Sequence, residues 1–155
     1  MELTVREDID VPIEQAFKMI SDFEIFERAA LRRGAEVERL DDLLRPGVGA
    51  KWRVNIAFRG KSRLINLAVT EFNRPTEVQI HAEVQGVRSD TRVELVALSR
   101  TCTRLNVWMG LKAKSLTARL LLQSLKLARS TLTQRLEQRV SSLGRDMEER
   151  FSRMV

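Results

Sequence analysis

The sequence is poor in the side chains that most often carry catalysis or bind metals. Its 155 residues include one cysteine, one histidine and no tyrosine. Cys102 has no partner for an intramolecular disulfide, and with only His81 beside it a His/Cys metal site cannot be assembled. The sequence contains no P-loop and no GxGxxG motif. We therefore expect neither a metal nor another cofactor, and we identify no catalytic residue.

Long apolar runs are also absent. The densest one, from residue 116 to residue 128, is interrupted by Arg119, Gln123 and Lys126, and it falls well short of the ~20 residues of a membrane span. The first ten residues, MELTVREDID, lack the apolar core of a signal peptide. Together with the lack of a disulfide, these absences predict a soluble, cytoplasmic protein.

Acidic residues are few in the C-terminal part of the chain. Residues 1–111 contain 17 Lys/Arg and 17 Asp/Glu, whereas residues 112–155 contain 10 and 4, which accounts for the whole net charge of +6. Such a basic segment is either a solvated helix face or a surface that attracts the phosphate groups of lipid or nucleic acid. Both alternatives stay open at this point.

Apolar and polar residues alternate through most of the first 111 residues. Leu3, Val5 and Ile9 alternate with polar neighbours, which is the period of a strand with one buried face. Residues 63–72 form a further strand, but both of its faces carry apolar residues. The breaks between strands are short, at residues 45–49, 59–61, 73–75, 86–90 and 99–102. Connections this short exclude parallel crossovers, so we expect about seven antiparallel strands.

Helical spacing is found in two regions. After the first strand, Pro12 suits the first turn of one short helix, and Ser21 or Asp22 can cap a second that Gly34 ends. Near the C-terminus, apolar residues step by three or four at Leu121, Leu125, Ala128, Leu132, Leu136 and Val140. We expect one long helix from Ser115 to Leu143, with Gly144 as its weak point and residues 144–155 as a helical extension or tail.

The terminal helix is the only expected element long and amphipathic enough to cover the apolar face of the sheet. The fold class we predict is therefore α+β, a helix-grip fold. Its antiparallel sheet of about seven strands wraps around the long C-terminal helix, and two short helices follow the first strand.

This order of elements is similar to the START-like superfamily, also called SRPBCC, which includes polyketide cyclase/dehydrase and lipid-transfer proteins. The segments that carry the resemblance are IDVPIEQAFKMISDFEIF at 9–26, PGVGAKW at 46–52, VTEFNRPTEV at 69–78 and the amphipathic C-terminal helix. The resemblance implies a ligand-binding domain over residues 1–143, with a cavity between sheet and helix for a lipid, a quinone or a polyketide. It implies no shared activity, because one fold hosts many functions.

The wall of such a cavity would be built from inward aromatic and aliphatic residues. Our candidates are Phe17, Phe23, Phe26, Trp52, Val54, Ile56, Phe58, Leu67, Val93, Leu95, Val107, Met109, Leu121, Leu125 and Leu132. The same residues could equally be close-packed core. Glu7 is a possible polar cavity group because it shares its strand face with Val5 and Ile9, and Asn66 is another if that face of its strand points inward. His81 falls on the polar face of its strand.

Three functions compete. The leading one is non-catalytic binding or transport of a small hydrophobic ligand, which requires a cavity of about 300 Å³ or more. The second is a polyketide cyclase/dehydratase-type enzyme, which requires an inward acid or base with a perturbed pKa. The third is a membrane- or RNA-interacting module, with RNA disfavoured because aromatic residues are not interleaved with the basic ones of the helix.

The apolar residues in the N-terminal half of the expected terminal helix predict that a further surface covers them. Leu116, Leu120, Leu122 and Leu127 lie off its main apolar stripe. A cover for this surface could come from the two short helices, from a homodimer contact or from an anionic membrane surface.

Overall fold

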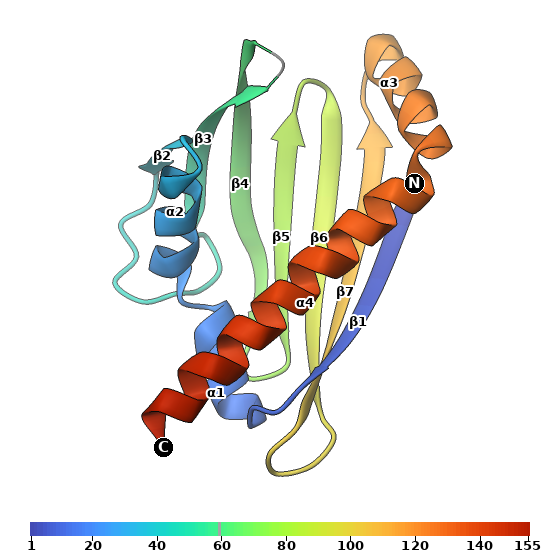
Figure 1. Ribbon diagram of the computed structural model, residues 1–155. Helices are drawn as coiled ribbons and strands as arrows, with labels where there is room; N and C mark the ends of the chain where they lie inside the picture. Colours follow the sequence, from blue (N-terminus) through green and yellow to red (C-terminus); the bar gives the residue numbers. More distant parts are fainter. Residues whose placement is uncertain (59) are drawn as a thin grey trace.

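A computed structural model describes residues 1–58 and 60–155, without the side chain of Phe58. Its elements follow the expected order (Figure 1): β1 (Glu2–Ile9), α1 (Ile13–Ile20), α2 (Phe23–Arg32), β2 (Glu36–Arg39), β3 (Lys51–Phe58), β4 (Lys61–Asn73), β5 (Glu77–Val84), β6 (Val87–Ala97), β7 (Thr103–Ala113), α3 (Leu116–Leu127) and α4 (Arg129–Met154).

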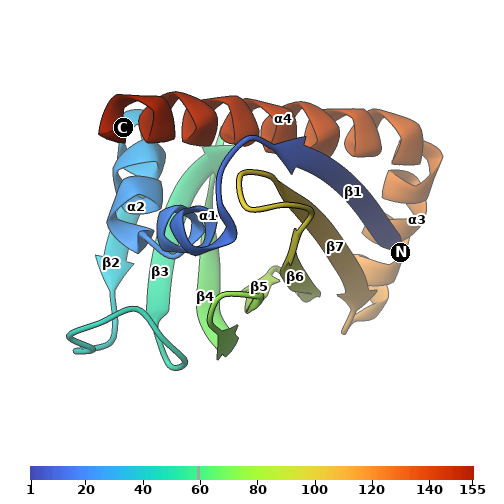
Figure 2. The same ribbon diagram turned by 90° about the horizontal axis from the view of Figure 1, so that it is seen from below.

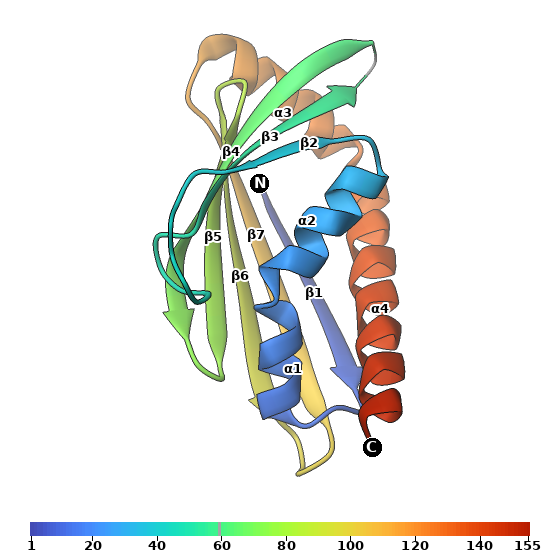
Figure 3. The same ribbon diagram turned by 90° about the vertical axis from the view of Figure 1, so that its left-hand side faces the viewer.

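The strands form one seven-stranded antiparallel sheet in the order β1-β7-β6-β5-β4-β3-β2. Figure 2 shows that the sheet is curved and that α1 and α4 lie on its concave side. Figure 3, seen from the side, shows α2 on the same side. The expected α+β helix-grip fold, with two short helices after the first strand, is thereby confirmed.

Strand register settles which face of β4 is buried. Leu67 pairs with Trp52 of β3 and Ala82 of β5, so it shares their concave face, whereas Asn66 pairs with Arg53 and lies on the convex face. A bulge between Val69 and Glu71 then shifts the register of the strand. The alternation in the sequence could not decide between the two faces because each carries apolar side chains.

The β5–β6 hairpin is tighter than the sequence indicated. The expected break at residues 86–90 is wrong: Val84 already pairs with Val87, and β6 includes Arg88 and Asp90. Gln85 and Gly86 form the turn with φ of 50° and 78°, the left-handed pair that a two-residue hairpin favours. Local polarity at 88–90 therefore belongs to the solvated face of a strand.

The expected single helix from Ser115 to Leu143 is replaced by two helices. The Ser115 hydroxyl caps α3 by accepting from the Ala118 amide, and α3 ends at Leu127. Ala128, with φ of −101° and ψ of 18°, separates it from α4. The break lets each helix turn its own apolar stripe inward: α3 buries Leu122 beside Val87, while α4 crosses the sheet over β1.

Helix α4 passes through Gly144 without interruption and continues to Met154, so the expected boundary at residues 143/144 falls inside a helix. Gly144 is buried against β1. Beyond it, Met147 is fully buried in the main core, and the Glu148 carboxylate accepts a hydrogen bond of 2.9 Å from the Asp10 amide. The C-terminal residues are thus packed on the domain.

A Cβ atom added at Gly144 would lie 2.9 Å from Ile9 Cγ2, closer than van der Waals contact allows. Ile9 is buried and β-branched, so it cannot rotate away at low cost. We expect Gly144→Ala to lower the free energy of unfolding by about 1–2 kcal/mol, because overpacking outweighs the ~1 kcal/mol gain in helix propensity. Urea denaturation measures this difference.

The matched control is Ser142→Ala, an exposed position two residues earlier in α4. It should leave the free energy of unfolding within about 0.5 kcal/mol of wild type or raise it slightly. Equal stabilisation by both substitutions would contradict the close approach.

Candidate functional site

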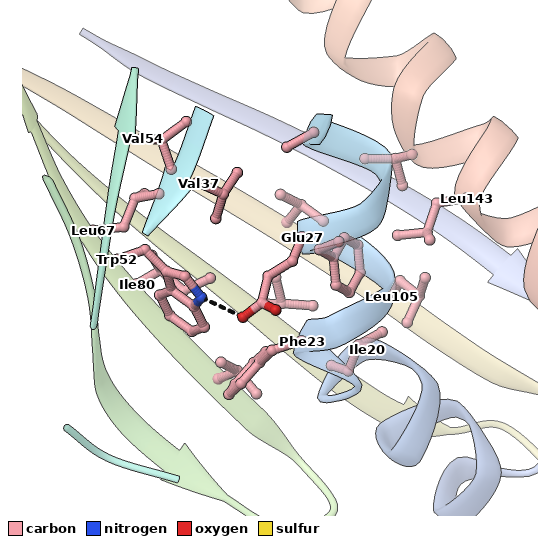
Figure 4. A pocket seen from close by; sticks show the side chains of 16 residues that line it. Ile20, Phe23, Glu27, Val37, Trp52, Val54, Leu67, Ile80, Leu105 and Leu143 are labelled. Carbon is pink, nitrogen blue, oxygen red and sulfur yellow. Dashed lines mark hydrogen bonds between the residues drawn. The ribbon is translucent and has the colours of Figure 1, made fainter. Parts of the chain in front are cut away.

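A partly open cavity of about 290 Å³ lies between the concave face of the sheet and helices α2 and α4 (Figure 4). Its volume is at the lower limit expected for a ligand pocket. Sixteen residues line it: Ile20, Phe23, Phe26, Glu27, Ala30, Val37, Trp52, Val54, Leu67, Val78, Ile80, Val93, Leu105, Val107, Val140 and Leu143. Among the residues that the structure describes, Glu27 is the one polar side chain of this wall.

The cavity exists because α4 lies close to β1 at the sheet's edge and bridges the curved middle strands. Val140 and Leu143 point from α4 toward the sheet, and the middle strands supply the opposite wall. Helix α2 closes one side with Phe23 and Ala30. Phe23 is fixed by an edge-to-face contact with Trp52, with ring centroids 5.1 Å apart.

Seven of the candidates from the sequence line this cavity: Phe23, Phe26, Trp52, Val54, Leu67, Val93 and Val107. They come from α2 and four different strands. Strand alternation and helical spacing predict only the face of each element, and these seven residues lie on faces that point to the sheet's concave side.

The other apolar candidates lie elsewhere. Phe17 and Leu95 are close-packed core, and Phe17 meets Phe72 edge to face at 5.1 Å. Ile56 borders a shallow depression beside α2, Met109 is half-buried outside the cavity, and the side chain of Phe58 is outside the described residues.

The helical candidates Leu121, Leu125 and Leu132 are also away from the cavity wall. The break at Ala128 removes Leu121 and Leu125 from the stripe of α4: Leu125 packs on the small cluster around Leu122, whereas Leu121 is exposed. Leu132 is half-buried on α4, before the part of that helix that reaches the cavity at Val140. The stripe was therefore correct for α4 at Val140 but was extended wrongly into α3.

Neither polar candidate reaches the cavity. Asn66 is exposed on the convex face, as its pairing with Arg53 requires. Glu7 lies on the edge strand under Gly144, in a polar groove of about 430 Å³ that also includes Glu137 and Arg145 of α4. None of the described residues that line this groove lines the cavity.

Glu27 is the polar cavity residue that the sequence analysis missed. It lies four residues after Phe23 and three before Ala30, so helical spacing puts it on the same face as these cavity residues. An acidic residue within the apolar stripe of this helix is the sequence signal that indicates a polar group on the cavity side. The Trp52 Nε1–H donates to Glu27 Oε1 at 2.7 Å, which the dashed line in Figure 4 marks.

Arg39 and Asp41 complete a network at the edge of the cavity. Arg39 donates from Nη1 to Glu27 Oε1 at 3.3 Å and from Nε to Asp41 Oδ2 at 2.5 Å, and its guanidinium lies 4.8 Å from the centre of the Trp52 ring. Asp41 also accepts from the amides of Lys51 and Leu43. Its hydrogen bond with Arg39, assisted by those amides, holds the pKa of Asp41 well below its usual range.

His81 lies on the convex face of the sheet, on the opposite side of β5 from the cavity-lining Ile80. Its ring nitrogens are 2.9 Å from Asp90 Oδ1 and 3.3 Å from Glu83 Oε1. Glu83 also pairs with Lys114, and Asp90 with Arg88. Because all of these partners are at least partly exposed, the cluster is a surface network of the sheet.

Within the described residues, no group of His, Cys, Asp and Glu side chains has an arrangement that could hold a metal ion. None of the helices described is both long enough and apolar enough to cross a membrane.

Comparison with protein-family models and with curated proteins gives no match. Solved structures do match. A point mutant of norcoclaurine synthase from Thalictrum flavum, in complex with a transition state analogue, has a TM-score of 0.70 at 11% identity, covering 97% of this chain and 95% of that one. An aromatase/cyclase from a Streptomyces species has a TM-score of 0.68 at 11% identity, with the same coverage of 97% and 95%.

A START superfamily protein from Mycobacterium smegmatis has a TM-score of 0.56 at 18% identity, covering 88% of this chain and 97% of that one. These likenesses confirm that the chain has the fold of START-like proteins, as its sequence segments indicated. At such identities they establish the fold alone.

The low pKa of Asp41 predicts how stability depends on pH. A carboxyl whose pKa is lower in the folded state contributes stability above its unfolded pKa of about 3.9, and that contribution is lost as the pH falls toward the folded value. We expect Asp41→Asn to lower the free energy of unfolding by about 1.5–3 kcal/mol at pH 7. When the pH is lowered from 5 to 3, the free energy of unfolding should decrease less in this variant than in wild type.

Asp42→Asn is the control, because Asp42 is an exposed neighbour. Guanidinium denaturation at each pH, followed by far-UV circular dichroism, gives the free energies. Identical pH dependence in wild type and Asp41→Asn would contradict the role of the carboxylate.

Proposed function

We propose that this protein binds a small hydrophobic molecule in the cavity between its sheet and helices α2 and α4, as a carrier or binder and not as a catalyst. The observation that carries the proposal is the wall itself: fifteen apolar side chains and one carboxylate enclose a space of about 290 Å³. An apolar ligand that fills such a space is removed from water on most of its surface, which is the main driving force for its binding.

The structural neighbours support a ligand-handling role. One is a synthase in complex with a transition state analogue, and another is an aromatase/cyclase. For acid–base chemistry of the cyclase or dehydratase type, a proton donor and a proton acceptor must be held at the reacting atoms. Among the described residues, Glu27 is the one group on the cavity wall that could serve, which favours binding over turnover.

The cavity limits the size of the ligand. At about 30 Å³ for each water-sized group, 290 Å³ accommodates roughly ten non-hydrogen atoms. A short lipid chain or one or two fused rings are of this size. A longer molecule, such as a long-chain lipid or a three-ring dye, inserts one part and extends through the opening of the cavity.

Filling the cavity should weaken ligand binding. Val93 lines the cavity, and Val93→Phe places a larger side chain in it. We expect this substitution to weaken binding of the neutral apolar dye N-phenylnaphthylamine at least about tenfold, because dye and side chain compete for the same volume. The enhancement of dye fluorescence on binding is the measurement.

Val96→Phe is the matched control on the same strand, since Val96 is exposed on the convex face. It should leave dye affinity unchanged, and circular dichroism should show both variants folded. Failure of the wild type to bind the dye, or equal affinity of the two variants, would contradict the proposed site.

A second surface favours attachment to an anionic membrane. Leu116, Leu120 and Leu127 lie on one face of α3 and are 75%, 62% and 91% exposed. Arg119 and Lys126 flank that face, and residues 95–136 contain no Asp or Glu. An apolar stripe bordered by cations is the arrangement of helices that lie in the headgroup region of a bilayer. We infer that α3 brings the carrier to such a surface.

Replacing Leu116, Leu120 and Leu127 together by Ser should reduce cosedimentation with phosphatidylglycerol-containing vesicles at least about fivefold. The wild type should bind these vesicles more weakly as the salt concentration increases, because salt screens the attraction between the basic residues and the anionic headgroups. Leu31, Leu64 and Leu98 are also exposed, and their joint replacement by Ser is the control. Vesicle binding that is unchanged at high salt, or equally weakened in the control, would contradict the inference.

A further inference from the structure

Glu27 is an unusual residue for an apolar cavity. Its side chain retains 25% of its exposure while sharing the wall with fifteen apolar residues. Figure 4 shows its carboxylate projecting from α2 between the residues of the helices and those of the sheet. A carboxylate is costly to remove from water without a hydrogen-bonding partner, so its partners determine what the cavity can accept.

The protein satisfies one oxygen of this carboxylate. Both Trp52 Nε1 and Arg39 Nη1 donate to Oε1, at 2.7 and 3.3 Å. Arg39 is itself held by Asp41 and stacked on the Trp52 ring. The carboxylate is therefore fixed in position before any ligand binds, which lowers the entropy lost on binding.

The other oxygen has no such partner. Within the described residues, no hydrogen bond is made to Glu27 Oε2, although an ionised carboxylate oxygen accepts readily. Solvent can satisfy Oε2 while the cavity is open. A ligand that displaces this solvent must replace its hydrogen bond, or the binding free energy is reduced by the cost of an unpaired charged oxygen.

The charges around Oε2 select the kind of polar group. Glu27 and Asp41 are acidic and Arg39 is basic, which leaves one formal negative charge on the three side chains. A hydroxyl or a protonated amine can donate to Oε2 in this environment, whereas a carboxylate would bring a second acceptor and a like charge.

We propose that the ligand is an apolar molecule with one hydrogen-bond-donating end, a hydroxyl or a protonated amine, which binds to Oε2 of Glu27 while Trp52 and Arg39 hold Oε1. This inference rests on the proposed binding function and specifies its ligand class. Glu27 thus separates donor-ended ligands from fatty acids of the same length.

Three probes with the same ten-carbon chain test the proposal: decanol, decylamine and decanoate, each displacing bound N-phenylnaphthylamine at pH 7. We expect decanol and decylamine to bind the wild type at least about tenfold more tightly than decanoate. Glu27→Gln should weaken decylamine binding about tenfold and strengthen decanoate binding, because the negative charge is lost.

Glu24→Gln is the matched control, since Glu24 lies one turn earlier on α2, pairs with Arg28 and has a side chain that is 73% exposed. It should preserve the wild-type order. The proposal would be overturned if decanoate bound the wild type as tightly as decanol. It would also be overturned if the three probes had the same order of affinity in Glu27→Gln as in Glu24→Gln. If the dye binds and none of the three probes displaces it, the proposal is also overturned, whereas a dye that does not bind overturns the proposed function itself.

Discussion

The close approach of helix α4 to strand β1 at Gly144 is the constraint on which the cavity depends. With no Cβ at this position, the helix backbone settles directly over Ile9 and Glu7 at one edge of the sheet. Because the sheet is curved, a helix held close at this edge stands away from the middle strands (Figure 2). Val140 and Leu143 reach toward those strands without filling the space, and the cavity remains between them.

The polar network at the cavity's edge depends on a second long-range arrangement. Helix α2 is held over β3 by the contact of Phe23 with Trp52, and the same Trp52 donates to Glu27 one turn further along the helix. Arg39 and Asp41 come from the end of β2 and the segment after it. Position and polarity are thus coupled, since the residues that orient the Glu27 carboxylate also fix the helix that carries it.

The break at Ala128 divides the C-terminal segment into two helices that pack on different parts of the sheet. Helix α4 covers the cavity, and α3 packs on β7 with Leu122 inside and Leu127 outside. In the single helix expected from the sequence, the apolar stripe would have continued through Leu121 and Leu125 to Val140, with Leu122 and Leu127 outside it. Figure 1 shows α3 at one end of the domain. Because α3 is rotated separately from α4, its exposed leucines lie there, beside its basic residues, and not on the cavity wall.

The sequence by itself determined the order of most elements and the buried faces of the strands that alternate cleanly. Alternation placed Trp52, Val93 and Val107 on one side of their strands, because side-chain direction in a strand is fixed locally. Tertiary structure decided what those faces meet. Glu7 was a possible polar group of the cavity and lies beneath Gly144, while Glu27 was not among the candidates and lines the wall. The physical reason is that strand pairing, helix rotation and the approach of α4 depend on contacts between residues far apart in the chain, which no local period records.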